Sequence, residues 1–185
     1  MKITFVTTNK HKFAEVQDIL KDFPIDLEWL NMKYDEDHED GIELTAKKAA
    51  KKLADELNKP IILEDTGLFF EAYPNFPGSA PKFVLNTLGY KGLLKLLDGE
   101  NRNAYFQTVA AYCEPGKEPV IFDGIMKGRF AEKILNEDKD AMPYDRFFIP
   151  EGHSKTISDM TLMEKSALSQ RGIAFKSFGE YITDK

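Results

Sequence analysis

Short strand-like runs alternate along the chain with longer segments whose apolar residues recur at helical spacing. This alternation constrains the fold more than any other feature of the sequence. Ile3–Val6 is a β-branched and aromatic run, and a polar turn separates it from apolar residues at helical spacing, namely Phe13, Val16, Ile19 (or Leu20) and Phe23. Residues 42–58 and 83–97 repeat the helical period, and Ile61–Leu63 between them has the composition of a buried strand. Strands joined by helices in this order favour parallel pairing, because parallel neighbours need a crossover connection.

The second half of the chain predicts a different arrangement. Ala104–Cys113 and Pro119–Lys127 are strand-like and flank a short segment with a Pro-Gly pair, which is typical of a hairpin turn, so we expect them to be antiparallel. Thr161 and Glu164 have the spacing of a capping box, and apolar residues continue from there as one final helix through Phe178. The whole pattern predicts the α/β class, with a mixed β-sheet, flanking helices and a cleft where strand-end loops converge.

Composition places the chain among soluble globular proteins, since 42% of its 185 residues are hydrophobic and 30% are charged. We expect a single domain over residues 1–185, in which Pro74–Pro81 is a loop. The net charge of −6 argues against a partner that is a nucleic acid polymer, and no apolar run approaches the roughly 20 residues that cross a membrane. Cys113 is the single cysteine and the N-terminus lacks a signal peptide's apolar length, so we expect a cytoplasmic protein.

The first candidate site is the polar turn between the first strand and the first helix, which contains Thr7, Thr8, Asn9 and Lys12. The N-terminus of a helix presents unpaired N–H groups and partial positive charge, and Lys12 is within reach of an anion bound there. The turn therefore suits a phosphate group. The alternative is that Asn9 only caps the helix and the lysines are solvated. The glycine-rich fingerprints of P-loop and Rossmann nucleotide sites are absent from the sequence.

Carboxylates form the second candidate site. Glu36, Asp37 and Asp40 lie in one acidic run, and Glu64 and Asp65 follow the buried strand, so we expect the second pair at a strand end. Carboxylates opposite a phosphate-binding turn suit Mg²⁺, which takes a few oxygen ligands and shares its shell with substrate phosphates. The alternative for the acidic run is a solvated loop. The histidines and the cysteine lack the spacing of a zinc site.

The third candidate site combines aromatic rings with polar donors. Tyr144 and Asp145 precede two phenylalanines, and Lys165, Gln170 and Arg171 lie in a later polar segment. Rings that stack on a flat base, together with amide and guanidinium donors that bind its edge, would form a nucleobase pocket. The alternative is that the aromatic residues belong to the hydrophobic core.

Five segments carry these residues in one order along the chain: Thr7-Thr8-Asn9-Lys10-His11-Lys12, Glu64-Asp65-Thr66-Gly67-Leu68, Phe76-Pro77-Gly78, Tyr144-Asp145 with Phe148-Ile149-Pro150, and Glu164-Lys165-Ser166-Ala167-Leu168-Ser169-Gln170-Arg171-Gly172. In order and content they resemble the motifs of the inosine triphosphate pyrophosphatase family, also called the Ham1-like or non-standard purine NTP pyrophosphatases. The resemblance extends over nearly the whole chain.

The resemblance implies an elongated α/β body with two lobes around a central nucleotide cleft, and a homodimer as the usual assembly. The implied reaction is Mg²⁺-dependent hydrolysis of ITP, dITP or XTP to the monophosphate and pyrophosphate, by attack of water on the α-phosphorus. Residue by residue, it implies that Asn9 and Lys12 contact the phosphates, that Glu36 and Asp65 hold the metal, and that Asp65 is also the catalytic base. Thr66 would touch the substrate, and Lys12 would assist catalysis by neutralising phosphate charge.

The resemblance also implies a pocket for the base and sugar. Its lining would come from Tyr144, Asp145, Lys165 and Arg171, joined by two residues at which this chain departs from the family pattern. Gln170 replaces the family's histidine before the arginine, and Met142 lies where the family has an aromatic ring. A glutamine amide still donates to a 6-oxo oxygen, and a methionine still packs on a purine face.

The sequence leaves two questions open. The family's helix lysine corresponds to either Lys48 or Lys51. The departures in the base pocket also leave alternatives: the same chemistry on a different damaged or modified nucleoside triphosphate, or a protein that binds nucleotides without hydrolysing them.

Overall fold

The computed structural model describes residues 1–34 and 41–185. Glu36, Asp37 and Asp40 therefore lie outside the described residues. The described elements, in chain order, are β1 (Lys2–Val6), α1 (Lys10–Leu20), β2 (Asp26–Leu30), α2 (Gly41–Leu57), β3 (Ile61–Phe70), β4 (Pro77–Gly78), α3 (Pro81–Leu96), β5 (Asn103–Cys113), β6 (Val120–Phe130), the 3₁₀ helix η2 (Pro143–Arg146), β7 (Phe148–Pro150), the 3₁₀ helix η3 (Ile157–Asp159), α4 (Leu162–Leu168) and α5 (Gln170–Thr183).

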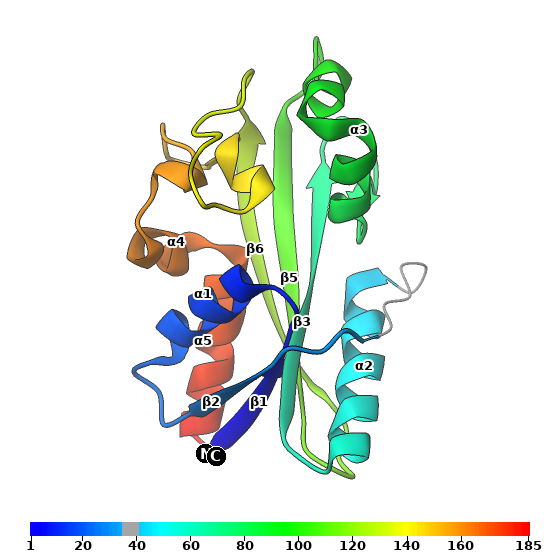
Figure 1. Cartoon of the computed structure of the whole chain (residues 1–185), viewed down its shortest axis with the longest axis vertical. Helices are drawn as coiled ribbons and strands as arrows, with labels where there is room; N and C mark the ends of the chain where they lie inside the picture. The colour runs from blue at the N-terminus through cyan, green and yellow to red at the C-terminus, as the bar shows by residue number, and fades with distance from the viewer. Residues whose placement is uncertain (35–40) are drawn as a thin grey trace.

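Within the described residues the strands form one seven-stranded sheet in the order β2-β1-β3-β5-β6-β7, with β4 paired to β3 (Figure 1). The pairs β1–β2 and β1–β3 are parallel, whereas β3, β5, β6 and β7 are joined by antiparallel pairs. Helices α1 and α5 cover one side of the sheet and α2 covers the other (Figure 1). The predicted mixed α/β class and the predicted hairpin are both confirmed.

Strand β3 differs from the prediction. We expected the buried strand to end at Leu63, with the carboxylates of Glu64 and Asp65 at its end, and this is wrong. The strand continues to Phe70, because Glu64 to Gly67 pair residue by residue with β5 as Ile61–Leu63 do. The two carboxylates therefore lie in the middle of the sheet. Because successive side chains of a strand point to opposite faces, Glu64 and Asp65 lie on opposite faces.

The expected single final helix is also wrong, because the chain breaks at Ser169 into α4 and α5. Thr161 caps α4 through the predicted capping box with Glu164, and the Ser169 hydroxyl caps α5 by accepting a hydrogen bond from Gly172 N–H. A Cβ on Gly172 would lie 1.9 Å from the carbonyl oxygen of Ser166, so only glycine permits this contact between the two helices. None of the helices in residues 1–34 and 41–185 is long and apolar enough to span a membrane.

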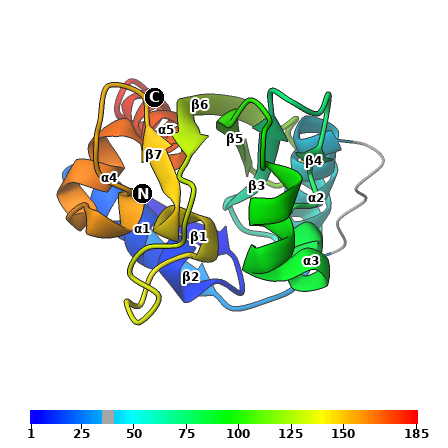
Figure 2. The same ribbon diagram turned by 90° about the horizontal axis from the view of Figure 1, so that it is seen from above.

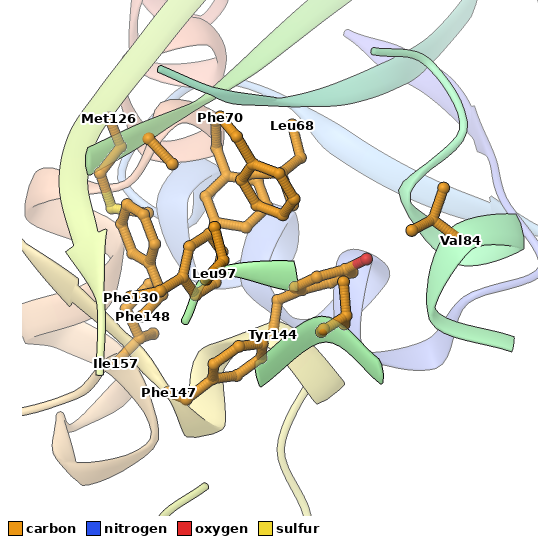
Figure 3. Close-up of a cluster of buried hydrophobic side chains, with 13 residues drawn as sticks. Leu68, Phe70, Val84, Leu97, Met126, Phe130, Tyr144, Phe147, Phe148 and Ile157 are labelled. Atoms are coloured by element: carbon orange, nitrogen blue, oxygen red, sulfur yellow. The ribbon is translucent and has the colours of Figure 1, made fainter. Parts of the chain in front are cut away.

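One face of β3, β5 and β6 carries two hydrophobic clusters with a polar row between them. The aromatic cluster comprises Leu68, Phe70, Val84, Leu97, Met126, Phe130, Tyr144, Phe147, Phe148 and Ile157 and their neighbours (Figure 3). A second cluster packs β1, α1 and α5 onto the other end of the same face. The row between them contains Thr66, Thr108 and Gly124, which pair across the three strands. Polar side chains thus interrupt the core along the middle of the sheet.

Helix α5 packs closely on this row at Gly124, and this contact gives a prediction. A Cβ at Gly124 would lie 2.0 Å from the carbonyl oxygen of Gln170 and 2.9 Å from the backbone nitrogen of Ala174. Both atoms are backbone, so α5 must shift to make room. We expect Gly124→Ala to lower the free energy of unfolding by about 1–3 kcal/mol, the usual cost of overpacking. Thermal and urea unfolding measure this change.

Ser177→Ala, on the exposed side of α5, is the control and should leave stability within about 0.5 kcal/mol of the original. Equal stability of the two variants would show that α5 does not approach the sheet this closely.

Candidate functional site

The candidate site lies where one edge of β3 is left without a strand partner. Strand β1 pairs with β3 only as far as Ile62, and β4 begins to pair with it at Leu68. Between these points the described residues provide no strand along this edge of β3. The hydroxyl of Tyr34 instead donates a hydrogen bond to the carbonyl oxygen of Glu64, at 2.9 Å. Residues 63–67 are therefore paired with β5 on one side and with no strand of the described residues on the other.

The polar turn after β1 lies beside this edge and is tightly organised. The side-chain oxygen of Asn9 accepts hydrogen bonds from the backbone N–H groups of His11 at 2.9 Å and Lys12 at 3.4 Å. The hydroxyl of Thr7 accepts from the N–H of Asn9 at 3.1 Å. Asn9 thus caps α1, as the simpler alternative proposed. The cap also places the ammonium group of Lys12 on the side of the turn that faces β3.

Trp29 on β2 supports the same turn, a role that was not predicted from the sequence. Its indole N–H donates to the carbonyl oxygen of Thr7 at 2.8 Å, and its ring stacks on Phe13 of α1 with centroids 5.0 Å apart. It is the single tryptophan of the chain and is 40% exposed. Trp29 is therefore a natural fluorescence probe of the turn.

A buried charge network begins at Lys12. The Lys12 ammonium lies 2.9 Å from the Oε1 atom of Glu64, whose two carboxylate oxygens also accept hydrogen bonds from Nε and Nη2 of Arg171, both at 2.9 Å. This bidentate geometry is the strong form of an arginine–carboxylate pair. Arg171 is only 1% exposed and Glu64 only 2%, so both charges depend on their partners.

The network continues from Arg171 to the other end of the site. Its third donor, Nη1, binds Glu15 of α1, and Glu15 also binds the ammonium of Lys165 on α4. Lys165 in turn lies 2.6 Å from a carboxylate oxygen of Asp145 and 3.8 Å from the sulfur of Met142. Six charges of alternating sign thus connect the turn after β1 to η2, with no net charge.

Burial and charge pull the carboxyl pKa values in this network in opposite directions. Burial by itself raises the pKa of Glu64, but the charges of Arg171 and Lys12 outweigh it and lower that pKa to about 2. Glu15 follows the same pattern, and its pKa is lowered by Arg171 and Lys165. Asp145 differs, because burial outweighs Lys165 and raises its pKa. Asp145 is therefore the carboxylate of the network that gains a proton most readily.

Asp65 lies on the opposite face of β3, toward α2. It is 7% exposed, and its Oδ1 atom accepts a hydrogen bond from the N–H of Thr66 at 2.8 Å. The Thr66 hydroxyl is on the face of Glu64 and shares a 2.7 Å hydrogen bond with that of Thr108. The candidate site consequently reaches around the open edge of β3, with the buried charge network on one face and Asp65 on the other.

The two candidate helix lysines are separated by the structure. Lys51 donates to the carbonyl oxygen of Lys117 and lies 2.9 Å from Glu118, so it is tied to the turn between β5 and β6. Lys48 instead lines a surface hollow of about 370 Å³ together with Tyr34 and Thr45, near the segment that follows β2. Lys48 is therefore the better candidate.

The residues predicted to form the base pocket lie partly in the hydrophobic core and partly in the candidate site. The Tyr144 ring belongs to the aromatic cluster, its hydroxyl donates to the carbonyl oxygen of Pro81 at 2.7 Å, and burial raises its pKa (Figure 3). Met142 and Asp145 instead contact Lys165. Gln170 is 7% exposed, and its Oε1 atom is buried without a hydrogen-bond partner among the described residues.

The structure thus joins some of the predicted residues directly and not others. Lys12, Arg171, Lys165, Asp145 and Met142 are joined by the buried charge network. Glu36 lies outside the described residues, and no group of three or more His, Cys, Asp or Glu side chains within residues 1–34 and 41–185 could hold a metal ion.

One residue of the network, Glu15, was not predicted as a site residue, and Glu64 was predicted as a carboxylate suited to Mg²⁺ rather than as the partner of Lys12 and Arg171. The signal for Glu15 was its position three residues after Lys12, which places both on one side of α1.

The fold and this site define a class of α/β protein with a charged site at an open strand edge, and the comparisons identify the family. Residues 3–181 match the Ham1 family model, and the chain belongs to this family. A dITP/XTP pyrophosphatase of Methanopyrus kandleri is 41% identical over 98% of this chain and 96% of its own length. A dITP/XTP pyrophosphatase of Saccharolobus solfataricus is 40% identical over 98% of this chain and 94% of its own.

Two solved structures have the same fold. A HAM1 protein from Coxiella burnetii superposes with a TM-score of 0.83 over 100% of both chains, at 24% identity. The nucleoside-triphosphatase, or dITP/XTP pyrophosphatase, of Mycobacterium abscessus superposes with a TM-score of 0.67 at 28% identity, covering 96% of this chain and 97% of its own. The predicted family is confirmed.

The low pKa of Glu64 gives a prediction about stability in acid. Its folded-state pKa of about 2 lies below the ordinary value of 4.5, so the stability that it contributes is present above pH 4.5 and is lost as pH falls toward 2. Across this range we expect the free energy of unfolding to fall more steeply for the native protein than for Glu64→Gln, by on the order of 3 kcal/mol in total. Urea unfolding at several pH values measures both slopes.

Glu164→Gln is the control. The Glu164 pKa is also lowered to about 2, by hydrogen bonds from Lys155 and Thr161, but this carboxylate is exposed at the start of α4. Its removal should change the slope far less. Identical slopes for the native protein and Glu64→Gln would contradict a buried, ionised Glu64.

Proposed function

We propose that this protein hydrolyses non-standard purine nucleoside triphosphates, namely ITP, dITP and XTP, to the monophosphate and pyrophosphate. The observation that carries the proposal is the position of Lys12, which follows the Asn9 cap and lies 2.9 Å from Glu64 of β3, the strand that also carries Asp65. Relatives of about 40% identity over nearly the whole chain bear the name dITP/XTP pyrophosphatase, which supports it.

Thr7, Thr8, Asn9 and Lys12 form the phosphate half of the proposed site. The N-terminus of α1 supplies partial positive charge, and Lys12 supplies a full one. Lys12 is 21% exposed at its side chain and already paired to Glu64, so it is held in position before a phosphate arrives. A preorganised cation of this kind stabilises negative charge without reorganising during the reaction.

Asp65, together with Glu36, would hold the Mg²⁺ that this chemistry uses. The carboxylate of Asp65 fits that cation, because Mg²⁺ prefers oxygen ligands and is commonly held by only one or two protein carboxylates beside substrate phosphates. When bound, the cation neutralises polyphosphate charge and stabilises the leaving pyrophosphate. Asp65 would in addition accept the proton of the water that attacks the α-phosphorus, and Thr66 would touch the substrate.

Met142, Tyr144, Asp145, Lys165, Gln170 and Arg171 form the base half. Arg171 gives its donors to Glu64 and Glu15, so we assign it the task of holding Glu15, which in turn holds Lys165. Lys165 and Asp145 would then meet the base or sugar from a fixed position. The buried Oε1 atom of Gln170 can accept a hydrogen bond while its amide nitrogen donates, which matches the N–H and 6-oxo edge of hypoxanthine and xanthine.

The proposal extends to the assembly and setting of the protein. We assign one NTP pyrophosphatase domain with two lobes to residues 1–185, and expect a homodimer in the cytoplasm. We expect neither a nucleic acid polymer nor a membrane as a partner.

Asp65→Asn tests the assigned base. The amide retains an oxygen that can accept the Thr66 hydrogen bond, so the fold should survive, but it accepts a proton poorly and binds a cation weakly. We expect ITP turnover with Mg²⁺ to fall by at least about 100-fold, with little change in thermal unfolding. The exposed Asp98→Asn is the matched control and should turn over normally. Normal turnover by Asp65→Asn would remove Asp65 from the mechanism.

Measuring ITP binding by Asp65→Asn shows whether the substitution impairs the chemical step or the binding of the substrate. Quenching or enhancement of Trp29 fluorescence by ITP should persist in Asp65→Asn if only the chemical step is lost. A native protein whose Trp29 responds to ITP but which releases no pyrophosphate would favour the alternative of a nucleotide-binding protein.

Gln170→His tests the base half. Because a histidine ring offers one donor and one acceptor in a different geometry from the amide, the ratio of kcat/KM for ITP to that for GTP should change by about 10-fold. Gln17→His, on the exposed side of α1, is the matched control and should leave the ratio unchanged. If Gln170→His also leaves it unchanged, Gln170 does not contact the base, and a different modified triphosphate becomes the stronger alternative.

A further inference from the structure

Trp29 on β2 contacts both ends of the turn that precedes α1. Helix α1 lies beside β1 and β2 at one edge of the sheet (Figure 2). At the start of the turn, the indole N–H of Trp29 donates to the carbonyl oxygen of Thr7 at 2.8 Å. At its end, the Trp29 ring stacks on Phe13, with centroids 5.0 Å apart and planes 13° from parallel. One side chain thus fixes the turn to β2 at two points.

A series of hydrogen bonds leads from this indole to Lys12. The hydroxyl of Thr7 accepts from the N–H of Asn9 at 3.1 Å, and the Asn9 side chain accepts from the N–H of Lys12 at 3.4 Å. The carbonyl oxygen of Asn9 also accepts from the N–H of Phe13 at 3.1 Å, which begins the hydrogen-bonding of α1. A shift of Thr7 would therefore move the N-terminus of α1 and the ammonium group of Lys12 together.

Pairing between strands holds little of the turn beyond Val6. The last register pair of β1 with β2 is Val6 with Leu30, and the pairing of β1 with β3 ends one residue earlier, at Phe5. The N–H of Thr7 still donates to the carbonyl oxygen of Leu30 at 3.2 Å. Because Thr7 is only 7% exposed, water offers its carbonyl oxygen little alternative to the indole, and a buried carbonyl without a partner is costly. The position of Thr7 therefore depends on Trp29.

We propose that Trp29 is a positioning residue for the phosphate half of the site. Its indole N–H fixes the backbone of the turn, and so holds the N-terminus of α1 and Lys12 in the arrangement that binds the polyphosphate of the substrate. Trp29 acts through Thr7 and does not itself contact the substrate. Donors that are already in place bind an anion more tightly than donors that must first be ordered. This inference rests on the proposed function and adds to it a residue of β2.

Because Trp29 is the single tryptophan of the chain, a tryptophan analogue changes this residue alone. In benzothienylalanine a sulfur atom replaces the indole N–H, so the donor is lost while the ring can still stack on Phe13. In protein made with this analogue, we expect the dissociation constant of tripolyphosphate, measured by calorimetry, and the KM for ITP to rise by about 5–10-fold. The kcat should change by less than about two-fold, because the turn binds phosphate charge in the ground state and the transition state alike.

Inosine shows whether the effect is confined to the phosphate half. It carries the base and the sugar without phosphate, so its binding depends on the base half, where Lys165 and Asp145 are held from α4 and η2. We expect the dissociation constant of inosine to be the same in the native and the analogue protein. A parallel rise for inosine and tripolyphosphate would mean that the lost hydrogen bond disturbs the whole site, and would contradict a positioning role in the phosphate half.

Trp29→Phe repeats the test with a standard amino acid, since phenylalanine offers a ring but no donor. Tyr73→Phe is the matched control. The Tyr73 hydroxyl donates to the carbonyl oxygen of Leu96 at 2.7 Å, beside the aromatic cluster, so this variant loses a bond of the same kind away from the turn. Both variants should unfold at a somewhat lower temperature, but only Trp29→Phe should bind tripolyphosphate more weakly. Equal tripolyphosphate binding by the two variants would contradict the proposal. The analogue protein decides the question if Trp29→Phe fails to fold.

The outcomes separate this inference from the proposed function. If the native protein hydrolyses ITP and the analogue protein has unchanged constants for ITP and tripolyphosphate, the role of Trp29 is wrong and the proposed function stands. If the native protein releases no pyrophosphate from any triphosphate but binds tripolyphosphate more tightly than the analogue protein does, the proposed function is wrong and the role of Trp29 stands. A native protein that neither hydrolyses ITP nor binds tripolyphosphate contradicts both.

Discussion

The candidate site depends on the burial of Arg171 between two carboxylates from different parts of the chain. Glu64 comes from the middle of β3 and Glu15 from α1, and the guanidinium of α5 binds both. Removing one partner from a buried ion pair generally costs about 3–5 kcal/mol, because the other charge is left in a low-dielectric interior. The three elements therefore hold one another in register through a single side chain, and Lys12 and Lys165 are positioned as a result.

The two-residue period of a strand explains why the site has two faces. Glu64 and Asp65 are neighbours in β3, so one must face α1 and α5 while the other faces α2. Glu64 is paired with Lys12 and Arg171 in the buried charge network, and its low pKa keeps it ionised. Asp65 is kept apart from those cations by the sheet itself. The alternation of β3 therefore places the two neighbouring carboxylates in different surroundings.

Much of the fold could be predicted because it rests on local signals. The strand Ile3–Val6, the cap at Asn9 and the capping box of Thr161 with Glu164 are each set by neighbouring residues, and all are present. The polar run after Leu63 misled the prediction, because pairing with β5 overrides its composition. The break at Ser169 was also hidden, since the apolar period continues on both sides of it.

The residues of the candidate site could be predicted from the sequence better than the contacts between them. Lys12, Lys165 and Arg171 belong to motifs. Glu15, the partner of Lys165 and Arg171, lies 150 residues before the first and 156 before the second, and no local pattern encodes such a pairing. Tyr144 was predicted as a pocket residue, and the structure adds that its ring belongs to the aromatic cluster and that its hydroxyl donates to the carbonyl oxygen of Pro81. Gln170 was also predicted as a pocket residue. The structure adds that its amide oxygen is buried without a hydrogen-bond partner among the described residues, which the sequence could not show.

The most direct test of the account is pyrophosphate release by the native protein from a panel of ITP, dITP, XTP, GTP, ATP, dUTP and modified pyrimidine triphosphates, each with Mg²⁺ and with EDTA. The account predicts release that requires Mg²⁺ and prefers ITP, dITP and XTP over GTP and ATP by at least about 10-fold. Equal release from ATP and ITP, or release that is undiminished by EDTA, would contradict it.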